Sequence, residues 1–324
     1  MEHVLPILSL ILGTVVASAA YGEESKTARI AFLLMGKSQA GLTSAFDEFR
    51  EGLRELGWLE KQNIVIEYRW AGENPDRLPE LAAELVRLKV DAIIGSTAGV
   101  RAAQQATTSI PIIMCIADDA VKQGFVTNLA RPGGNITGMA ADALELAKKR
   151  IEILHETVPK LSRIALLWNP PGSAPDYLKD TQMAARSLGV TVQSVEVRTA
   201  DDFGIAFAAV LKGRAQALVV GPGQFMFTHQ RPIVEFAVNN ALPSIFAWKD
   251  PVSAGGLLGY GVNIPTAYHR AAYYVDKILK GAKAGDLPIE EPTKYDFVVN
   301  LKTAKALGIT VPESILLRAD EVIR

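Results

Sequence analysis

The stretch that decides the fold is Leu129-Ala-Arg-Pro-Gly-Gly-Asn-Ile-Thr-Gly-Met-Ala140. Its Pro-Gly-Gly break is followed by a short run of strand-like and small residues, and a helical pattern begins at Ala141. Similar alternations of strand-like and helix-like segments lie on both sides of the stretch. We therefore interpret it as the point where the chain leaves one lobe and enters a second, with a cleft between the two.

Apolar runs typical of buried parallel strands alternate with amphipathic segments along most of the chain. Before the crossing, we expect strands at 29–35, 63–68, 90–95 and 110–117, and helices at 46–56, 75–88 and 100–107. After it, we expect strands at 163–168, 191–197, 217–220, 243–247 and 257–260, and helices at 144–158, 177–188, 232–240 and from Asp201 onward. Strands that alternate with helices indicate an α/β fold with parallel sheets covered on both faces.

The end of the chain adds a long helix at 267–279, a strand at 295–300 and a helix at 301–307. Because the second lobe already has a full set of strands, we expect the long helix to pack back on the first lobe and the last segments to return to the second. The first lobe then comprises 28–139 plus 263–290, and the second comprises 140–262 plus 291–324. Three crossings make a hinge, at which we expect Met139, Ala140, Gly261, Val262, Glu291 and Pro292.

The composition excludes several classes of protein. A chain of 324 residues is long enough for about two domains. The formal net charge of −1 gives no basic excess for binding nucleic acid, and no single-sign run suggests a polybasic membrane patch. Cys115 is the only cysteine, so no internal disulfide can form and no thiol-based metal site is indicated.

The N-terminus predicts an export signal. Residues 4–17 are almost wholly apolar, and Ala17-Ser-Ala-Ala20 offers the small residues that signal peptidase requires. The run is shorter than the ~20 residues that a membrane-spanning helix needs. We expect a signal peptide at 1–20 that is removed, which places the mature protein in the periplasm. A buried N-terminal helix is the alternative, because Met1-Glu-His3 lacks Lys and Arg.

Ligands of open parallel sheets bind beyond the carboxyl ends of the strands, where helix N-termini present free amides. This rule selects a set of candidate ligand-binding residues that share this position: Gly36, Ser38, Ser96, Thr97, Ala98, Asp118, Asp119, Asn169, Pro222, Gln224, Trp248 and Tyr260.

Three of these groups suit particular ligand chemistry, and each has a simpler structural explanation. Ser96 and Thr97, ahead of a helix, suit a carboxylate but could equally cap the helix. Asp118 and Asp119 suit an ammonium group or sugar hydroxyls but could cap the next helix. Trp248 and Tyr260 could wall a ligand pocket or close the edge of a core.

Known catalytic and cofactor patterns do not occur in the sequence. It has no Gly-x-Ser-x-Gly, Walker, His-Glu-x-x-His or Cys-x-x-Cys motif. A cleft enzyme would depend on Asp118, Asp119 and His229 alone. We therefore expect a binding protein without catalytic residues, metal ligands or cofactors.

Five motifs occur in a consistent order: Glu67-Tyr-Arg-Trp70, Leu78-Pro-Glu-Leu-Ala-Ala-Glu-Leu-Val86, Leu129-Ala-Arg-Pro-Gly-Gly-Asn-Ile-Thr-Gly138, Leu301-Lys-Thr-Ala-Lys-Ala-Leu-Gly308 and Pro312-Glu-Ser-Ile-Leu-Leu-Arg-Ala-Asp-Glu321. Together they resemble the bacterial ABC transporter substrate-binding protein family that includes tryptophan- and tyrosine-binding members. The chain departs from the family at Ser96-Thr97, where members often have Gly-Thr, and at Asp118-Asp119, where Asp-Pro is common.

The resemblance implies a type I periplasmic binding fold with two Rossmann-like lobes and a three-segment hinge. It implies capture of a small organic solute, such as an amino acid or another small carboxylate, by a monomer that delivers it to the transmembrane permease of an ABC importer. A sensing protein that presents its solute to a membrane receptor is the alternative, because only surface contacts would differ.

Overall fold

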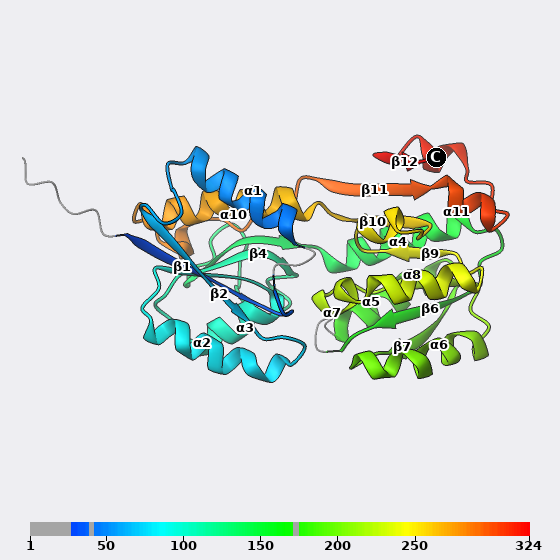
Figure 1. Cartoon of the computed structure of the whole chain (residues 1–324), viewed down its shortest axis with the longest axis horizontal. Helices are drawn as coiled ribbons and strands as arrows, with labels where there is room; N and C mark the ends of the chain where they lie inside the picture. The colour runs from blue at the N-terminus through cyan, green and yellow to red at the C-terminus, as the bar shows by residue number, and fades with distance from the viewer. Residues whose placement is uncertain (1–26, 39–41, 171–174) are drawn as a thin grey trace, which may run out of the picture.

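The computed structural model describes residues 27–38, 42–170 and 175–324, which form two α/β lobes (Figure 1). The expected signal peptide at 1–20 lies outside the described residues. Within the described part, no helix combines the length and the apolar character needed to cross a bilayer.

The first lobe is built on a sheet of five parallel strands, counted over the described residues, in the order β2-β1-β3-β4-β5. These strands are β1 (Ala28–Leu34), β2 (Ile64–Trp70), β3 (Ala92–Ser96), β4 (Ile112–Asp118) and β5 (Ile136–Ala141). Its helices are α1 (Thr43–Glu55), η1 (Pro75–Arg77), α2 (Leu78–Arg87), α3 (Thr97–Ala106), α10 (Ile264–Leu279) and η3 (Ala284–Asp286).

Both faces of this sheet are buried, which explains why β1 reads as a continuous apolar run. Phe32 points to the face covered by α1 and α10, where its ring centroid lies 5.0 Å from that of Phe46 and 6.0 Å from that of Tyr268. Leu33 points to the opposite face, covered by α2 and α3. The expected helix at 267–279 does pack on the first lobe.

The second lobe has a seven-stranded sheet, again over the described residues, in the order β12-β11-β10-β9-β8-β6-β7. Its strands are β6 (Arg163–Trp168), β7 (Thr191–Glu196), β8 (Ala217–Val220), β9 (Ser244–Phe246), β10 (Leu258–Val262), β11 (Tyr295–Asn300) and β12 (Glu321–Ile323). Its helices are α4 (Ala143–Thr157), α5 (Pro175–Ser187), η2 (Ala200–Asp202), α6 (Phe203–Lys212), α7 (Gln224–Thr228), α8 (Gln230–Asn239), α9 (Asp250–Ser253), α11 (Leu301–Ala306) and α12 (Glu313–Leu316).

The second sheet is mixed, and the expectation of parallel strands is wrong for one pair. β11 runs antiparallel to β10, with Tyr295 opposite Val262 and Val299 opposite Leu258. The reason is the crossing between the lobes. β10 ends at the boundary where the chain leaves the lobe, and β11 begins where it returns, so the two neighbours must run in opposite directions.

Three chain segments join the lobes, and hydrogen bonds tie them together. Glu290 exchanges backbone bonds with β5, accepting from Ala140 N and donating to Gly138 O, both at 3.0 Å. Asn263 N donates to Lys294 O at 3.1 Å, and its side chain caps α10. Met139 and Ala140, the expected pivot, lie inside β5, which continues to Ala141 by pairing with Asp118 of β4, while Met139 pairs with Glu290 of the third segment.

Candidate functional site

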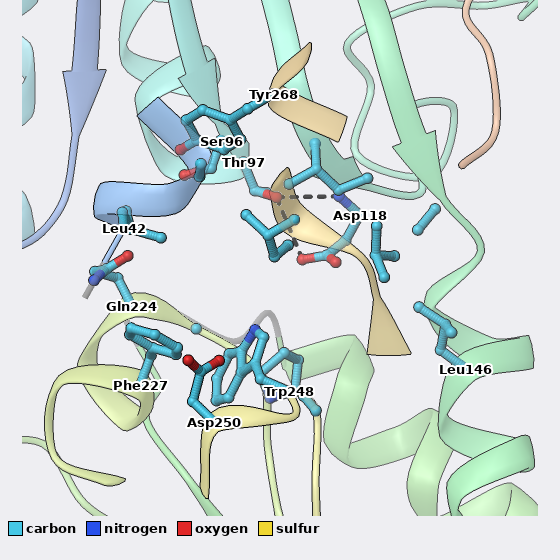
Figure 2. A pocket seen from close by; sticks show the side chains of 18 of the residues that line it. Leu42, Ser96, Thr97, Asp118, Leu146, Gln224, Phe227, Trp248, Asp250 and Tyr268 are labelled. Carbon is cyan, nitrogen blue, oxygen red and sulfur yellow. Dashed lines mark hydrogen bonds between the residues drawn. The ribbon is translucent and has the colours of Figure 1, made fainter. Parts of the chain in front are cut away.

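A pocket of about 210 Å³ lies between the lobes, at the carboxyl ends of their strands. Figure 2 shows two sets of side chains facing each other across it. The first-lobe set includes Leu42, Ser96, Thr97, Asp118 and Tyr268, and the second-lobe set includes Gln224, Phe227, Trp248 and Asp250. Both lobes therefore contribute to one binding surface.

The turn between β3 and α3 places Ser96 and Thr97 on the pocket wall. The Ser96 side chain makes no capping hydrogen bond, although its residue is the N-cap of α3. The Thr97 hydroxyl instead donates to Asp118 Oδ2 at 3.3 Å and accepts from Asp118 N at 3.1 Å. α3 packs closely against β1 at Gly99, where a Cβ would lie 2.0 Å from Leu33 O.

Asp118 is the acidic group of the first lobe in the pocket. Burial raises the pKa of its carboxyl, while the Thr97 hydroxyl and the Arg150 guanidinium lower it.

Asp119 does not line the pocket. Its backbone has a φ of +40°, and its N–H donates to Ala141 O at 3.0 Å. Burial and the neighbouring Asp142 carboxylate raise the pKa of Asp119 to about 6.

Aromatic and apolar groups from the second lobe form the opposite wall. The rings of Phe227 and Trp248 pack edge to face, with centroids 5.3 Å apart at 83°. Gln224 reaches the mouth of the cleft near the first lobe, since a Cβ on Gly36 would lie 3.3 Å from Gln224 Cγ. Asp250 opens α9 and also lines the pocket (Figure 2).

Arg150 of α4 lines the same pocket, and its side chain is held by the second lobe. Its Nε donates to Tyr260 O at 2.8 Å and its Nη1 to the Tyr177 hydroxyl at 3.1 Å. The residue is 3% exposed. Our sequence reasoning missed both Arg150 and Tyr177. A signal existed, because Arg150 lies three residues after Ala147 and four before Leu154, on the helical face that is otherwise apolar.

The structure brings seven of the twelve sequence-selected residues to the pocket wall: Ser96, Thr97, Ala98, Asp118, Pro222, Gln224 and Trp248. The other five are not part of the wall. Gly36 lies at the mouth, Ser38 is exposed outside it, and Asp119 is not among the lining residues.

Asn169 and Tyr260 were expected to face a ligand and instead have structural contacts. Asn169 is 3% exposed and donates from Nδ2 to Val197 O at 2.8 Å, which ties the end of β6 to the chain after β7. The Tyr260 ring stacks on Tyr295 over the sheet, so only its carbonyl oxygen acts near the pocket, through Arg150. The side chains of β10 alternate, which puts Tyr260 on the core face.

Outside the pocket, an ion pair joins the lobes. Lys122 Nζ of the first lobe lies 3.1 Å from Asp180 Oδ2 and 3.7 Å from Asp176 Oδ1, both on α5 of the second lobe. The Asp180 side chain is 4% exposed and that of Lys122 is 40% exposed. In the described residues, no three His, Cys, Asp or Glu side chains are placed to hold a metal ion.

Comparison with known proteins identifies relatives over nearly the whole chain. The sequence model of the family described as ABC transporter substrate binding protein matches residues 34–323. A tyrosine-binding protein from Clostridioides difficile (strain R20291) is 28% identical over 306 residues, covering 90% of this chain and 86% of that protein.

Two solved structures share the fold, which is that of type I periplasmic binding proteins. An ABC domain in complex with L-Trp from Streptococcus pneumoniae superposes with a TM-score of 0.82 at 23% identity, over 92% of this chain and 100% of that one. A ligand-free, open substrate-binding protein from Clostridium difficile gives 0.65 at 24% identity, over 92% and 99%.

Proposed function

From the premise that the chain belongs to the ABC transporter substrate-binding protein family, we propose that it captures a small amino acid in the pocket between its lobes. It then delivers this solute to the permease of an ABC importer. The observation that carries the proposal is the pocket itself, because strand ends of both lobes supply its walls. A solute held there contacts both lobes and favours the closed arrangement over an open one.

The lining of the pocket supports an amino acid with an apolar or aromatic side chain. Phe227 and Trp248 offer ring faces and edges that suit another aromatic group. Asp118 and Arg150 offer opposite charges from opposite lobes, which suits a zwitterion. The tyrosine-binding and L-Trp-bound relatives have solutes of this class.

The arrangement of the lobes supports closure around the solute. At nearly equal identity, the chain superposes better on the L-Trp-bound relative than on the ligand-free, open one. The ion pair from Lys122 to Asp180 and the contact at Gly36 both require lobes that are close together. We propose that the protein works outside the cytoplasmic membrane, as a monomer without a cofactor, and performs no catalysis.

The test is ligand binding by the protein without residues 1–20, unfolded and refolded to remove any bound solute. Calorimetry and thermal unfolding are measured with the twenty amino acids, aromatic acids and short peptides. We expect tyrosine, tryptophan or phenylalanine to raise the Tm, because a ligand at 100 times its Kd stabilises the folded state by about 2.7 kcal/mol. If no organic solute raises the Tm, solute capture is refuted. Uptake of the labelled solute, lost on gene deletion and restored by the wild-type gene, tests the importer role.

A further inference from the structure

Arg150 is a buried cation whose hydrogen-bond partners among the described residues are neutral. Its Nε and Nη1 donate to the Tyr260 carbonyl and the Tyr177 hydroxyl. Among the described residues, no carboxylate forms an ion pair with its guanidinium. Charged groups that are 3% exposed are otherwise paired with an opposite charge, because their burial without one is strongly unfavourable. The Asp118 carboxylate acts on this guanidinium through its charge, and no hydrogen bond or ion pair within 4.0 Å joins the two described side chains.

The position of Arg150 shows where an anion would bind. The residue lines the interlobe pocket, and no hydrogen bond to a described residue occupies its Nη2. Gly261 of β10 allows close packing here, since a Cβ on it would lie 1.9 Å from Ala247 O and 3.4 Å from Arg150 Nη2. The two bonds at Nε and Nη1 hold the guanidinium plane fixed, so the remaining donor is preorganised.

The other candidate for an anion, the N-terminus of α3, is less suitable. Thr97 at its start is hydrogen bonded to the Asp118 carboxylate at 3.3 Å. A ligand carboxylate placed against the free backbone amides at the start of α3 would lie beside the Asp118 carboxylate, and two carboxylates that share a site repel each other. An ammonium group fits better next to Asp118, which leaves the carboxylate to the opposite lobe.

We propose that Arg150 binds the carboxylate of the solute from the second lobe, while Asp118 of the first lobe faces its ammonium group. The proposal rests on the proposed function, because it assigns the parts of the amino acid to the two lobes. It makes the solute a charged bridge across the cleft. Arg150 then selects acids over amides and amines of the same shape.

The experiment compares L-tryptophan and L-tyrosine with their carboxamides and with tryptamine and tyramine, by calorimetry, on the wild type and on Arg150→Gln. The wild type should bind each acid about 10- to 100-fold more tightly than its amide, the difference expected for a charge-assisted hydrogen bond. In Arg150→Gln the acids should weaken by that factor, while the amides change less than about threefold. Arg150→Lys should restore part of the preference for the acid.

Two controls separate this role from a structural one. Lys149→Gln removes a positive charge from the neighbouring position of α4, where the side chain is 36% exposed and pairs with Glu152, and should leave every affinity unchanged. Tyr177→Phe removes one anchor of Arg150 but keeps its charge, and should weaken acids by only a few-fold.

The inference is overturned if the wild type binds acid and amide equally, a result that needs no variant to fold. It is also overturned if Arg150→Gln weakens both ligands alike. If neither amino acid binds the wild type, amino acid capture has failed, and Arg150 is judged separately. Indole-3-propionate should then still raise the Tm of the wild type more than indole-3-propionamide does. In Arg150→Gln the two probes should raise the Tm equally. An equal Tm rise for the two probes on the wild type would overturn the inference.

Discussion

Replacing Lys122 with methionine should weaken solute binding without touching the pocket. Lys122 Nζ lies 3.1 Å from Asp180 and 3.7 Å from Asp176 across the boundary between the lobes. Lys122 is not among the residues that line the pocket. The substitution therefore removes an attraction between the lobes and leaves the direct contacts with the solute intact.

The burial of the two partners sets the size of the effect. Removing one partner of a fully buried ion pair costs about 3–5 kcal/mol, whereas exposed pairs contribute about 0–1 kcal/mol. Here the Asp180 side chain is 4% exposed and that of Lys122 is 40% exposed, so solvent screens the pair in part. We expect a loss of about 1–2 kcal/mol in the closed state, which corresponds to a 5- to 30-fold weaker Kd. Most of this change should fall on the dissociation rate.

Stopped-flow measurement of solute dissociation, at low and high salt, tests this expectation. Lys148→Met is the matched control, because the ion-pair partners of Lys148 on α4, within the described part of the chain, are Glu145 and Glu152 of its own helix, at 3.8 and 4.0 Å. Adding Asp180→Asn to Lys122→Met should recover part of the loss by removing the unpaired charge. Dissociation rates within twofold of the wild type in Lys122→Met would refute the reasoning.

The remaining predictions concern stability and the pocket wall. Asp119 has a pKa of about 6, above its value in the unfolded chain, so the folded state binds more protons and becomes less stable as the pH rises from about 4 to 6. Asp119→Asn should therefore raise the Tm at pH 8 by about 2 °C and leave the Tm at pH 4 unchanged. A gain in Tm at pH 4 alone would contradict this. In urea unfolding, Gly99→Ala should lower the free energy of unfolding by about 1–3 kcal/mol, because the new Cβ would clash with Leu33 O. Gly204→Ala in α6 should raise the free energy of unfolding by about 0.5–1 kcal/mol, because a Cβ there meets nothing within 4 Å. Trp248→Ala should weaken aromatic amino acids by about 10- to 100-fold and alanine much less in calorimetry, and an equal loss for both would rule out a side-chain wall.

Much of the fold could be predicted because the periodicity of apolar residues is a local property. The expected strand at 163–168 coincides with β6, and the one at 29–35 differs from β1 by a single residue at each end. The strand-end rule also selected residues that the structure places around the pocket, Ser96, Asp118 and Trp248 among them. Their contact with a solute remains a prediction.

Several of the pocket residues that were missed lie on helices, where the strand-end rule does not apply. Arg150 and Tyr177 reach the pocket from α4 and α5, and Tyr268 reaches it from α10. Which helical residue reaches a cleft depends on how the helix is seated on the sheet, and helix spacing along the chain does not contain that information. Asn169 is the opposite case, a strand-end residue whose amide bonds to Val197 O.

By itself, the sequence determined that there are two α/β lobes, that the stretch at 129–140 begins the passage between them, and that the long helix at 267–279 returns to the first lobe. These features follow from hydrophobic pattern and from the need to cover each sheet. Only the tertiary structure decided that β11 runs antiparallel to β10, that Lys122 meets Asp180 across the lobes, and that Arg150 reaches the pocket from α4 with the Tyr260 carbonyl holding its guanidinium. Each of these depends on the relative placement of segments far apart in the chain, which burial and charge pairing fix only after the lobes have come together.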